Sequence, residues 1–341
     1  MFLETPCGFP TKVVISDEPH SEYLPTTSWI LLGDISVRSI WQSFSLPEPP
    51  VTMWVETSEA TKRIETIVPW LEHWAACNIH RNYILVVVGG GIMTDMGGLA
   101  ASLYSRGIPW HSWPTSLLGQ IDAGIGGKTG VNLDSGKNLA GTFHHPEQTV
   151  VFVKFLDSLS QKHQKSGMWE LVKMALIEGD LSRAESLLEC EKLSTEDIKW
   201  AIALKIGIVH QDFREKGHRR LLNLGHTFGH ALEAASNHSL LHGEAVGLGL
   251  LMACLLSENN KIASFPNSFT EKMANQLAPL SQHIPAWGKC IPFLLRDKKN
   301  EDGGKVHFII PIPGTTPVQQ KFSPESLESI HAKLLMMTRP H

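Results

Sequence analysis

Short apolar runs alternate with amphipathic stretches through the first half of the chain. The run at residues 83–88 is continuous and rich in β-branched side chains, as buried parallel strands are. A helical period covers residues 59–77. Strands that alternate with helices are typical of a parallel α/β sheet. The predicted strands are residues 12–16, 28–32, 83–88 and 149–153.

Near residue 160 the pattern changes to long helical segments. The helical period marks residues 166–178, 195–211, 222–235 and 243–258, and a late strand is predicted at residues 306–310. This change predicts two domains. An α/β domain would occupy residues 1–158 and a mainly α-helical domain residues 159–341.

Composition narrows the class of protein. The chain is 42% apolar and 19% charged with a formal net charge of -4, so it has no net attraction for a nucleic acid backbone. Its five cysteines are scattered and form no CxxC pair, which argues against a disulfide framework or a cysteine zinc site. We found no membrane-length apolar run and no leader pattern. These features predict a cytoplasmic protein without nucleic acid or membrane partners.

Three glycines, Gly89, Gly90 and Gly91, follow the buried strand, and a helix is predicted from residue 95. Glycines at a strand-to-helix turn let backbone approach a phosphate, and the helix N-terminus adds unpaired N–H groups. The GxGxxG spacing is absent. The turn therefore indicates nucleotide binding, with a tight turn that only packs a helix on the sheet as the alternative.

Two histidines lie four residues apart at His226 and His230, on one face of a predicted helix. Asn223, three residues before His226, is predicted to share this face, and Arg219 would continue the polar stripe if the helix reaches that far. The alternative to metal binding for such a pair is a solvated helix face, or a histidine hydrogen-bonded to a backbone carbonyl.

A third histidine, His242, opens the next helix, and Glu170 lies far upstream on another. Two histidines and a carboxylate form an open zinc-type site with room for a substrate oxygen. The spacing does not decide which two of the three histidines bind a metal.

A glycine-rich segment at residues 120–138 carries Lys128, Lys137 and Asn138, which are donors suited to a phosphorylated substrate. The Walker spacing fails because Asp122 stands where its first glycine is required. A flexible surface loop is the alternative interpretation.

Together these motifs resemble the 3-dehydroquinate synthase family over about half of the chain. The matching stretches are residues 89–95, 105–107, 114–118, 122–138, 170–173 and 222–244. The flanks match poorly, although Glu59 and Lys62 fall on a family Glu-x-x-Lys pair and residues 297–299 on a late Asp-Lys-Lys motif. The resemblance implies a Rossmann-like N-terminal domain, a helical C-terminal domain and a homodimer.

The resemblance also implies roles for individual residues. The metal, zinc or else cobalt, would be bound by Glu170, His226 and His242. The catalytic set would be His230, Lys128, Asp122, Asn223 and Lys173. The substrate would be held by Arg106, Asn138, Lys205, Arg219 and Lys298, with Arg106 reaching from a partner subunit. NAD would be bound by Asp34, Glu59, Lys62, Gly90, Gly91, Asp95, Thr115, Ser116 and Lys137.

The implied reaction is that of a lyase of the shikimate pathway of aromatic amino acid biosynthesis. It converts 3-deoxy-D-arabino-heptulosonate 7-phosphate to 3-dehydroquinate and phosphate through transient oxidation by NAD, phosphate elimination, re-reduction and aldol closure. The sequence departs from the family pattern at Thr94, Trp113, residues 158–160 and Trp169. The alternatives are a sister cyclase for another sugar phosphate, a metal-dependent alcohol dehydrogenase of similar fold, and a non-catalytic relative.

Overall fold

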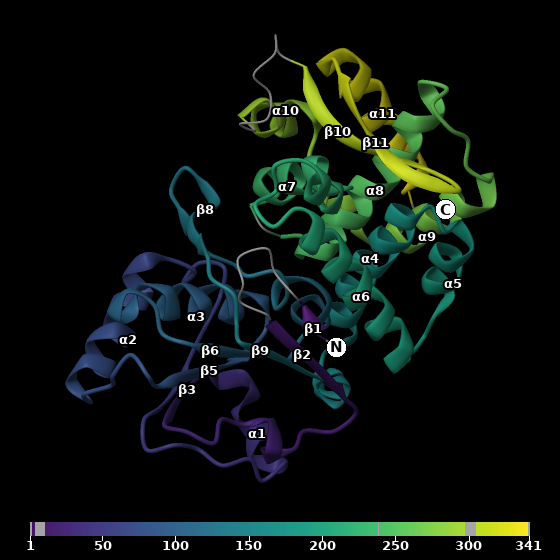
Figure 1. Cartoon of the computed structure of the whole chain (residues 1–341). Coiled ribbons are helices and arrows are strands. Elements are labelled where there is room, and N and C mark those ends of the chain that lie inside the picture. The colour runs from purple at the N-terminus through teal and green to yellow at the C-terminus, as the bar shows by residue number, and fades with distance from the viewer. Residues whose placement is uncertain (1, 4–10, 238, 297–304, 340–341) are drawn as a thin grey trace. The chain divides into compact units, whose positions relative to one another are not determined.

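The computed structural model describes residues 2–3, 11–237, 239–296 and 305–339, which contacts divide into two compact units (Figure 1). The first unit holds Met1–Gln164 and Ser194–Arg214, and the second holds Lys165–Leu193 and Glu215–His341. Helix α6 (Thr195–Gln211) therefore belongs to the first unit, whereas the sequence analysis had placed it with the second. Its periodicity shows that one face is apolar but not which surface covers that face.

The first unit is built on a sheet of seven strands, of which six run parallel, so the predicted α/β class is confirmed. The short β1 pairs antiparallel at one edge. In spatial order the strands are β1 (Phe2–Leu3), β2 (Thr11–Ser16), β9 (Gln148–Phe152), β6 (Trp110–Pro114), β5 (Ile84–Gly89), β3 (Trp29–Asp34) and β4 (Thr52–Val55).

The sheet is buried on both faces, which explains the continuous apolar runs. Ile30 and Leu32 pack in one core with Trp70, while the intervening Leu31 packs in the other with Trp41. Figure 1 shows α2 (Ile64–Ala76) and α3 (Gly91–Leu103) on one side of the sheet and α1 (Arg38–Ser43) on the other. Each buried large apolar side chain contributes about 1.5–3 kcal/mol to folding.

The order of the strands reverses between β3 and β5, because β4 lies on one side of β3 and β5 on the other. Asp34 ends β3 and Gly89 ends β5. In open α/β sheets the carboxyl ends of the strands at such a reversal are where ligands bind. The glycine turn therefore stands at the position where this fold places a ligand.

The glycine-rich segment after Asp122 is not a flexible loop. It begins in a short π-helical turn, η4 (Gly119–Ala123), and continues as a hairpin of β7 (Lys128–Leu133) and β8 (Gly136–Phe143). A Cβ at Gly141 would overlap the Thr129 carbonyl of the facing strand, so the glycine permits close pairing. The glycines that suggested a loop thus serve a hairpin.

The second unit is mainly helical, as predicted. Its central helix, α8 (His242–Asn259), is buried over almost its whole length, and the unit contains further helices and one hairpin. These are α4 (Gln161–Glu178), α5 (Leu181–Glu189), α7 (His226–Ala235), α9 (Asn267–Leu277), α10 (Trp287–Arg296), α11 (Pro324–Met337) and the hairpin of β10 (Val306–Ile312) and β11 (Thr315–Phe322). Among the described residues we find no helix long and apolar enough to cross a membrane.

Candidate metal centre and cofactor site

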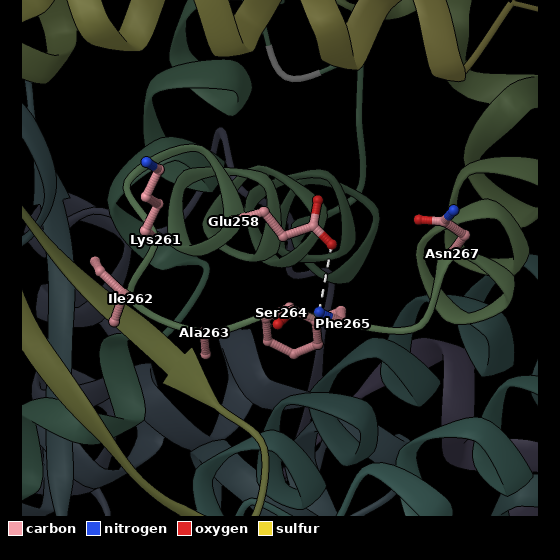
Figure 2. Close-up of a pocket in the computed structure, with 7 residues that line it drawn as sticks. All are labelled: Glu258, Lys261, Ile262, Ala263, Ser264, Phe265 and Asn267. Atoms are coloured by element: carbon pink, nitrogen blue, oxygen red, sulfur yellow. Dashed lines mark hydrogen bonds between the residues drawn. The ribbon is translucent and has the colours of Figure 1, made fainter.

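A hollow of ≈ 460 Å³ opens where α8 ends (Figure 2). Its lining includes Glu258, which accepts a 3.4 Å hydrogen bond from the backbone N–H of Phe265. None of the site residues predicted from the sequence lies among the described residues that line it. The candidate chemistry therefore lies elsewhere.

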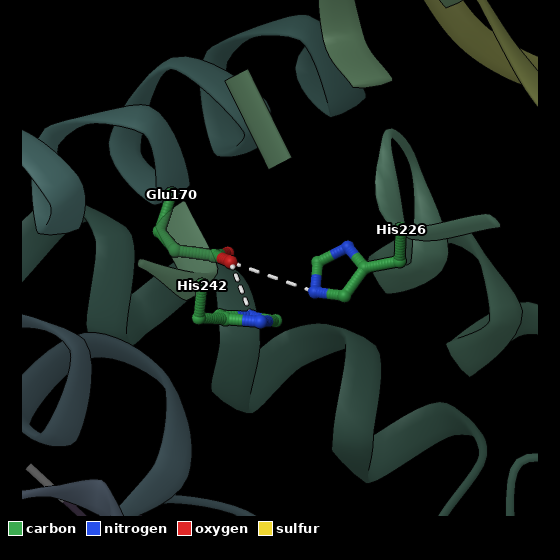
Figure 3. A group of neighbouring side chains, drawn as sticks. All are labelled: Glu170, His226 and His242. Carbon is green, nitrogen blue, oxygen red and sulfur yellow. Dashed lines mark ion pairs between the residues drawn. The ribbon is translucent and has the colours of Figure 1, made fainter. Parts of the chain in front are cut away.

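Three helices of the second unit bring Glu170, His226 and His242 together (Figure 3). One ligand atom from each lies within 4.8 Å of the other two. Glu170 is fully buried, and its Oε1 is 3.5 Å from His226 Nε2 and 3.4 Å from His242 Nε2. These are the three residues that the family resemblance implied as metal ligands.

The close approach of these helices depends on glycine. A Cβ at Gly249 of α8 would overlap the carbonyl of Gly225, which directly precedes α7. A Cβ at Gly229 of α7 would come within 3.0 Å of the Ala245 carbonyl. The glycines therefore let the backbones of α7 and α8 touch, which sets His226 beside His242.

The tautomer of His226 is set by the backbone. Burial lowers the pKa of His226 to about 3, so its ring is neutral and carries one N–H. Its Nδ1 lies 3.1 Å from the Leu224 carbonyl oxygen, which can only accept a hydrogen bond, so Nδ1 donates. The Nε2 lone pair consequently faces the Glu170 carboxylate, an arrangement that a cation between the two atoms would stabilise.

Glu233 plays the corresponding part for His242. The Nδ1 of His242 donates to Glu233 Oε2 over 3.2 Å, which turns Nε2 toward Glu170. Burial alone would lower the pKa of His242, but hydrogen bonds to the Glu170 and Glu233 carboxylates raise it to about 10. A carboxylate behind a ligating histidine is the usual second layer of a zinc site, where it fixes the ring and increases its basicity.

The donor set fits a divalent metal in chemistry and in spacing. Ligands about 2.0–2.2 Å from a tetrahedral zinc lie roughly 3.4 Å from one another, and Glu170 Oε1 stands 3.4 and 3.5 Å from the two Nε2 atoms. The other oxygen of Glu170 is held in an ion pair by the buried Lys173. Three protein ligands leave a fourth position for a substrate oxygen.

One prediction about this region was wrong. Arg219 and Asn223 do not continue the stripe of His226, because α7 begins at His226 and the preceding Gly225 has a left-handed φ of 76°. Asn223 ends a separate 3₁₀ turn, η6 (His218–Asn223), and donates to Glu215 Oε1 over 2.7 Å. The sequence alone did not reveal that the glycine breaks the helical period.

The histidine left over from the pair stays close to the metal candidates. His230 is exposed on α7, and its ring centroid is 5.3 Å from that of His226 and 5.9 Å from that of His242. His230, Glu233 and His242 also have ligand atoms within 4.8 Å of one another. Glu233, however, already accepts the hydrogen bond of His242, which favours the group containing Glu170.

In the first unit, α3 begins at Gly91, earlier than predicted, with Gly90 at its N-cap in extended conformation. The helix N-terminus thus follows the glycines directly, as a bound phosphate requires. On the next turn, Asp95 Oδ2 pairs with Lys62 Nζ at 2.6 Å, and Lys62 also donates to Asn138 Oδ1 over 2.6 Å. One buried lysine therefore connects α3, β8 and the segment before α2.

A second charged group of this unit surrounds Glu59. Asn132 donates to its Oε1 over 2.8 Å, and Lys137 Nζ lies 3.4 Å from the same oxygen. Burial would raise the pKa of Glu59, but the charges of Lys137 and Lys62 and the bond from Asn132 lower it. Glu59, Lys62, Asp95, Lys137 and Asn138 thus lie in one network.

The remaining predicted cofactor residues lie at the strand ends. Asp34 accepts hydrogen bonds from Thr57 and from the hydroxyl of Ser36, at 2.5 Å for the latter. The N–H of Thr115 donates to the Gly89 carbonyl over 2.9 Å, and the Ser116 hydroxyl accepts from Gly119 over 3.1 Å. These contacts hold the predicted residues beside the glycine turn.

The predicted catalytic residue Asp122 is paired with the predicted substrate residue Lys205 of α6. Lys205 Nζ donates to Asp122 Oδ1 over 2.6 Å and also to its carbonyl oxygen. The lysine side chain is 5% exposed and the aspartate side chain 25%. This contact explains why α6 belongs with the first unit.

Comparison with known proteins decides the family. A model of the 3-dehydroquinate synthase N-terminal domain matches residues 52–166, and one of the C-terminal domain matches residues 167–300. A 3-dehydroquinate synthase of Solibacter usitatus (strain Ellin6076) is 39% identical over 264 residues, 74% of each chain. Another, from Campylobacter jejuni subsp. doylei, is 37% identical over 89% of this chain and 87% of its own.

This chain belongs to the 3-dehydroquinate synthase family.

Solved structures agree with this family's fold. The 2-epi-5-epi-valiolone synthase of Streptomyces hygroscopicus subsp. jinggangensis 5008, with NAD+ and Zn2+ bound, is 26% identical with a TM-score of 0.80, covering 95% of this chain and 96% of its own. A 2-deoxy-scyllo-inosose synthase with carbaglucose-6-phosphate, NAD+ and Co2+ is 23% identical with a TM-score of 0.79, covering 95% and 97%. A probable glycerol dehydrogenase from Sinorhizobium meliloti 1021 is more distant in fold, at a TM-score of 0.58.

Some residues implied by the family resemblance stand outside these clusters. Arg106 and Lys128 are exposed, at a left-handed φ of 65° before Gly107 and at the start of β7 respectively. Arg219 is buried at 2% exposure in the second unit. Lys298 lies outside the described residues. The roles of these residues stay predictions.

Sequence reasoning missed the partners that orient the ligands. Glu233 is not among the predicted site residues, although it lies seven residues after His226 on the same helix. A carboxylate at that spacing from a histidine was the available signal. The bond from His226 to the Leu224 carbonyl had no signal, since any residue supplies a carbonyl.

Proposed function

We propose that this protein catalyses the 3-dehydroquinate synthase reaction of the shikimate pathway. It converts 3-deoxy-D-arabino-heptulosonate 7-phosphate to 3-dehydroquinate and phosphate. Relatives of that name match 74% and 89% of the chain at 39% and 37% identity. The observation that carries the proposal is the trio of Glu170, His226 and His242. Their ligand atoms lie within 4.8 Å of one another, and the two rings are oriented by the Leu224 carbonyl and by Glu233.

The implied cofactors are NAD and one divalent metal, zinc or cobalt. NAD+ is bound in the two cyclase structures, with Zn2+ in one and Co2+ in the other. When bound, these groups would supply a transient hydride acceptor and polarisation of a substrate alcohol. Glu170, His226 and His242 would hold the metal. The glycine turn at Gly90 and Gly91 would hold the pyrophosphate of NAD against the start of α3.

The chain's own polar residues would bind and orient the substrate. The buried guanidinium of Arg219 suits the substrate carboxylate, because its planar donors match both oxygens. Asp122 and Lys205 form a pair that can accept from and donate to hydroxyl groups. Lys128, Asn138 and His230 would donate to the phosphate and stabilise its charge as it leaves. Lys173 would keep Glu170 ionised and in place.

The second candidate is a sister cyclase acting on a different sugar phosphate, since two such enzymes are similar in fold at TM-scores of 0.79 and 0.80. Their identities of 23% and 26% are well below the 39% of the dehydroquinate synthase relative. Neither glucose 6-phosphate nor sedoheptulose 7-phosphate has a carboxylate for Arg219 to bind. The dehydroquinate synthase reaction is therefore favoured.

The proposal is tested by following phosphate release from 3-deoxy-D-arabino-heptulosonate 7-phosphate with zinc and a catalytic amount of NAD, while recording NADH absorbance. Phosphate released without net NADH supports a redox-neutral cyclase. Release only from glucose 6-phosphate or sedoheptulose 7-phosphate would assign a sister cyclase, and NADH accumulating with simple alcohols a dehydrogenase. The homodimer and the cytoplasmic location stay predictions.

A further inference from the structure

Helices α4 and α8 meet at three successive points, and one of them is the metal candidate itself. Glu170 of α4 faces His242 of α8. Next to this contact Ser166 meets Gly243, and Trp169 meets Gly247. Two packing contacts between the same two helices therefore adjoin the contact between the two ligands.

At the contact between Ser166 and Gly243 the two backbones touch. The N–H of Gly243 donates to the Ser166 hydroxyl over 3.1 Å. A Cβ at Gly243 would overlap the Ser166 carbonyl, so no residue larger than glycine fits there without moving a helix. This contact fixes how closely the start of α8 approaches α4.

At the contact between Trp169 and Gly247 the indole ring fills the space that a side chain at Gly247 would occupy. A Cβ at Gly247 would stand 2.5, 2.7 and 2.9 Å from Cδ2, Cε2 and Cγ of Trp169. Real Cβ atoms do not approach that closely, so Trp169 and Gly247 fit only as a pair. Trp169 is 5% exposed, and protein interiors are closely packed, so its ring would have to displace neighbouring atoms to make room for the methyl.

We propose that Trp169 and Gly247 are positioning residues for the metal centre, which set the distance between Glu170 and His242. The inference rests on the metal site of the proposed function. Trp169 directly precedes Glu170, and Gly247 lies five residues after His242 on α8. A displacement of either helix at this contact would be passed to the ligand atoms. Ligand sets tolerate errors of only about 0.5 Å.

The test compares Gly247→Ala with a matched control. Gly288→Ala also adds a methyl to a helical glycine of the second unit, but nothing lies within 4 Å of that position. Each purified variant is stripped with a chelator and titrated with Co2+, and the affinity and the visible Co2+ spectrum are recorded. Thermal unfolding of each metal-free variant is measured alongside.

The expected result is a loss of Co2+ affinity of about 10- to 100-fold in Gly247→Ala with an altered spectrum, and no change in Gly288→Ala. Trp169→Ala should also weaken binding. In the Trp169→Ala background, however, Gly247→Ala should cause no further loss, because the space for the methyl is then open. This comparison keeps the test informative if Gly247→Ala alone does not fold.

Affinity within twofold of the parent in Gly247→Ala, together with lower thermal stability, would overturn the inference and leave packing as the role of the contact. An equal loss from Gly247→Ala in both backgrounds would overturn it as well. A parent protein that bound no Co2+ would overturn the metal site itself, a failure distinguishable from that of the positioning contact.

Discussion

The two units differ in what surrounds their buried carboxylates. In the first unit Asp95 is paired with Lys62 and Asp122 with Lys205, each at 2.6 Å. In the second unit the Nε2 atoms of His226 and His242 point at an oxygen of Glu170 from 3.5 and 3.4 Å. The first arrangement pairs each carboxylate with one lysine, whereas the second brings two histidine nitrogens to a carboxylate that already has a lysine partner, Lys173.

This difference separates a scaffold from a ligand site. Matched ion pairs hold elements in place, and removing one partner leaves a buried charge uncompensated. Ligand atoms that converge on one point are favourable only when a proton or a metal lies among them. The pair in the first unit should therefore report on folding, and the trio in the second on metal binding.

The largest effect is expected from replacing one residue of the trio. His242→Ala removes one of three ligands, so bound zinc and phosphate release should both fall to background. Metal content after dialysis and the phosphate assay measure this. The control is His283→Ala, which removes an exposed histidine of the same unit and should keep both. A zinc-free His242→Ala protein with full activity would refute the assignment.

The next largest effect is expected from breaking the ion pair between Lys62 and Asp95. Lys62→Met leaves the Asp95 carboxylate without its cation in a site where burial already raises the pKa of that carboxyl. Breaking such a pair costs about 3 kcal/mol of unfolding free energy. Denaturant unfolding should show this loss, while Co2+ affinity stays at the parent value.

The double variant Lys62→Met/Asp95→Asn tests whether the unpaired charge of Asp95 causes the loss of stability. With the charge of Asp95 removed, most of the lost stability should return. No recovery in the double variant, or a fall in Co2+ affinity in the single variant, would contradict the separation of the two units' roles.

A smaller effect is expected from Glu233, which accepts the hydrogen bond of His242. Glu233→Gln keeps the shape of the side chain but removes the charge that accepts from His242 Nδ1. Loss of such a partner weakens metal binding by about 10- to 100-fold, equivalent to about 1.4–2.7 kcal/mol. Competition with a chromogenic chelator measures the change. Unaltered affinity would show that His242 is oriented without Glu233.

The smallest effect concerns a histidine of the first unit that has no part in either cluster. Burial lowers the pKa of His111 on β6 to about 4. The unfolded chain, with a histidine pKa of about 6.5, binds the proton first, so folding stability falls as pH drops from about 6.5 toward about 4. Between about pH 7.5 and 5.5 the loss should be about 1 kcal/mol.

Comparing His111→Gln with the parent isolates this effect. The stability difference between the two proteins should shift in favour of the variant as pH falls through that window. A difference independent of pH would show that His111 does not titrate as its burial indicates.

The sequence predicted the elements of the fold well where hydrophobic periodicity was long. The strand that ends at Gly89 and the helices that carry Glu170 and His242 lie where they were expected. The hairpin of β7 and β8 was missed because its glycines, which permit close strand pairing at Gly141, look in sequence like those of a loop. Glycine marks both features, and only the backbone separates them.

The candidate site was predictable in composition but not in geometry. Residue types and the family resemblance named Glu170, His226 and His242, yet spacing alone left the choice among three histidines open. The proposed choice of His226 and His242 is supported by the left-handed Gly225 and by the bonds to Leu224 and Glu233, which orient each ring. These depend on tertiary contacts that no single-sequence pattern records.

The most direct test of the metal-dependent cyclase is a stepwise return of metal to chelator-treated protein, with phosphate release measured at each addition in the presence of NAD. The account predicts that release is absent without metal, rises in proportion to added Zn2+ or Co2+, and reaches its plateau at one equivalent per chain without net NADH. Full phosphate release from metal-free protein would contradict it.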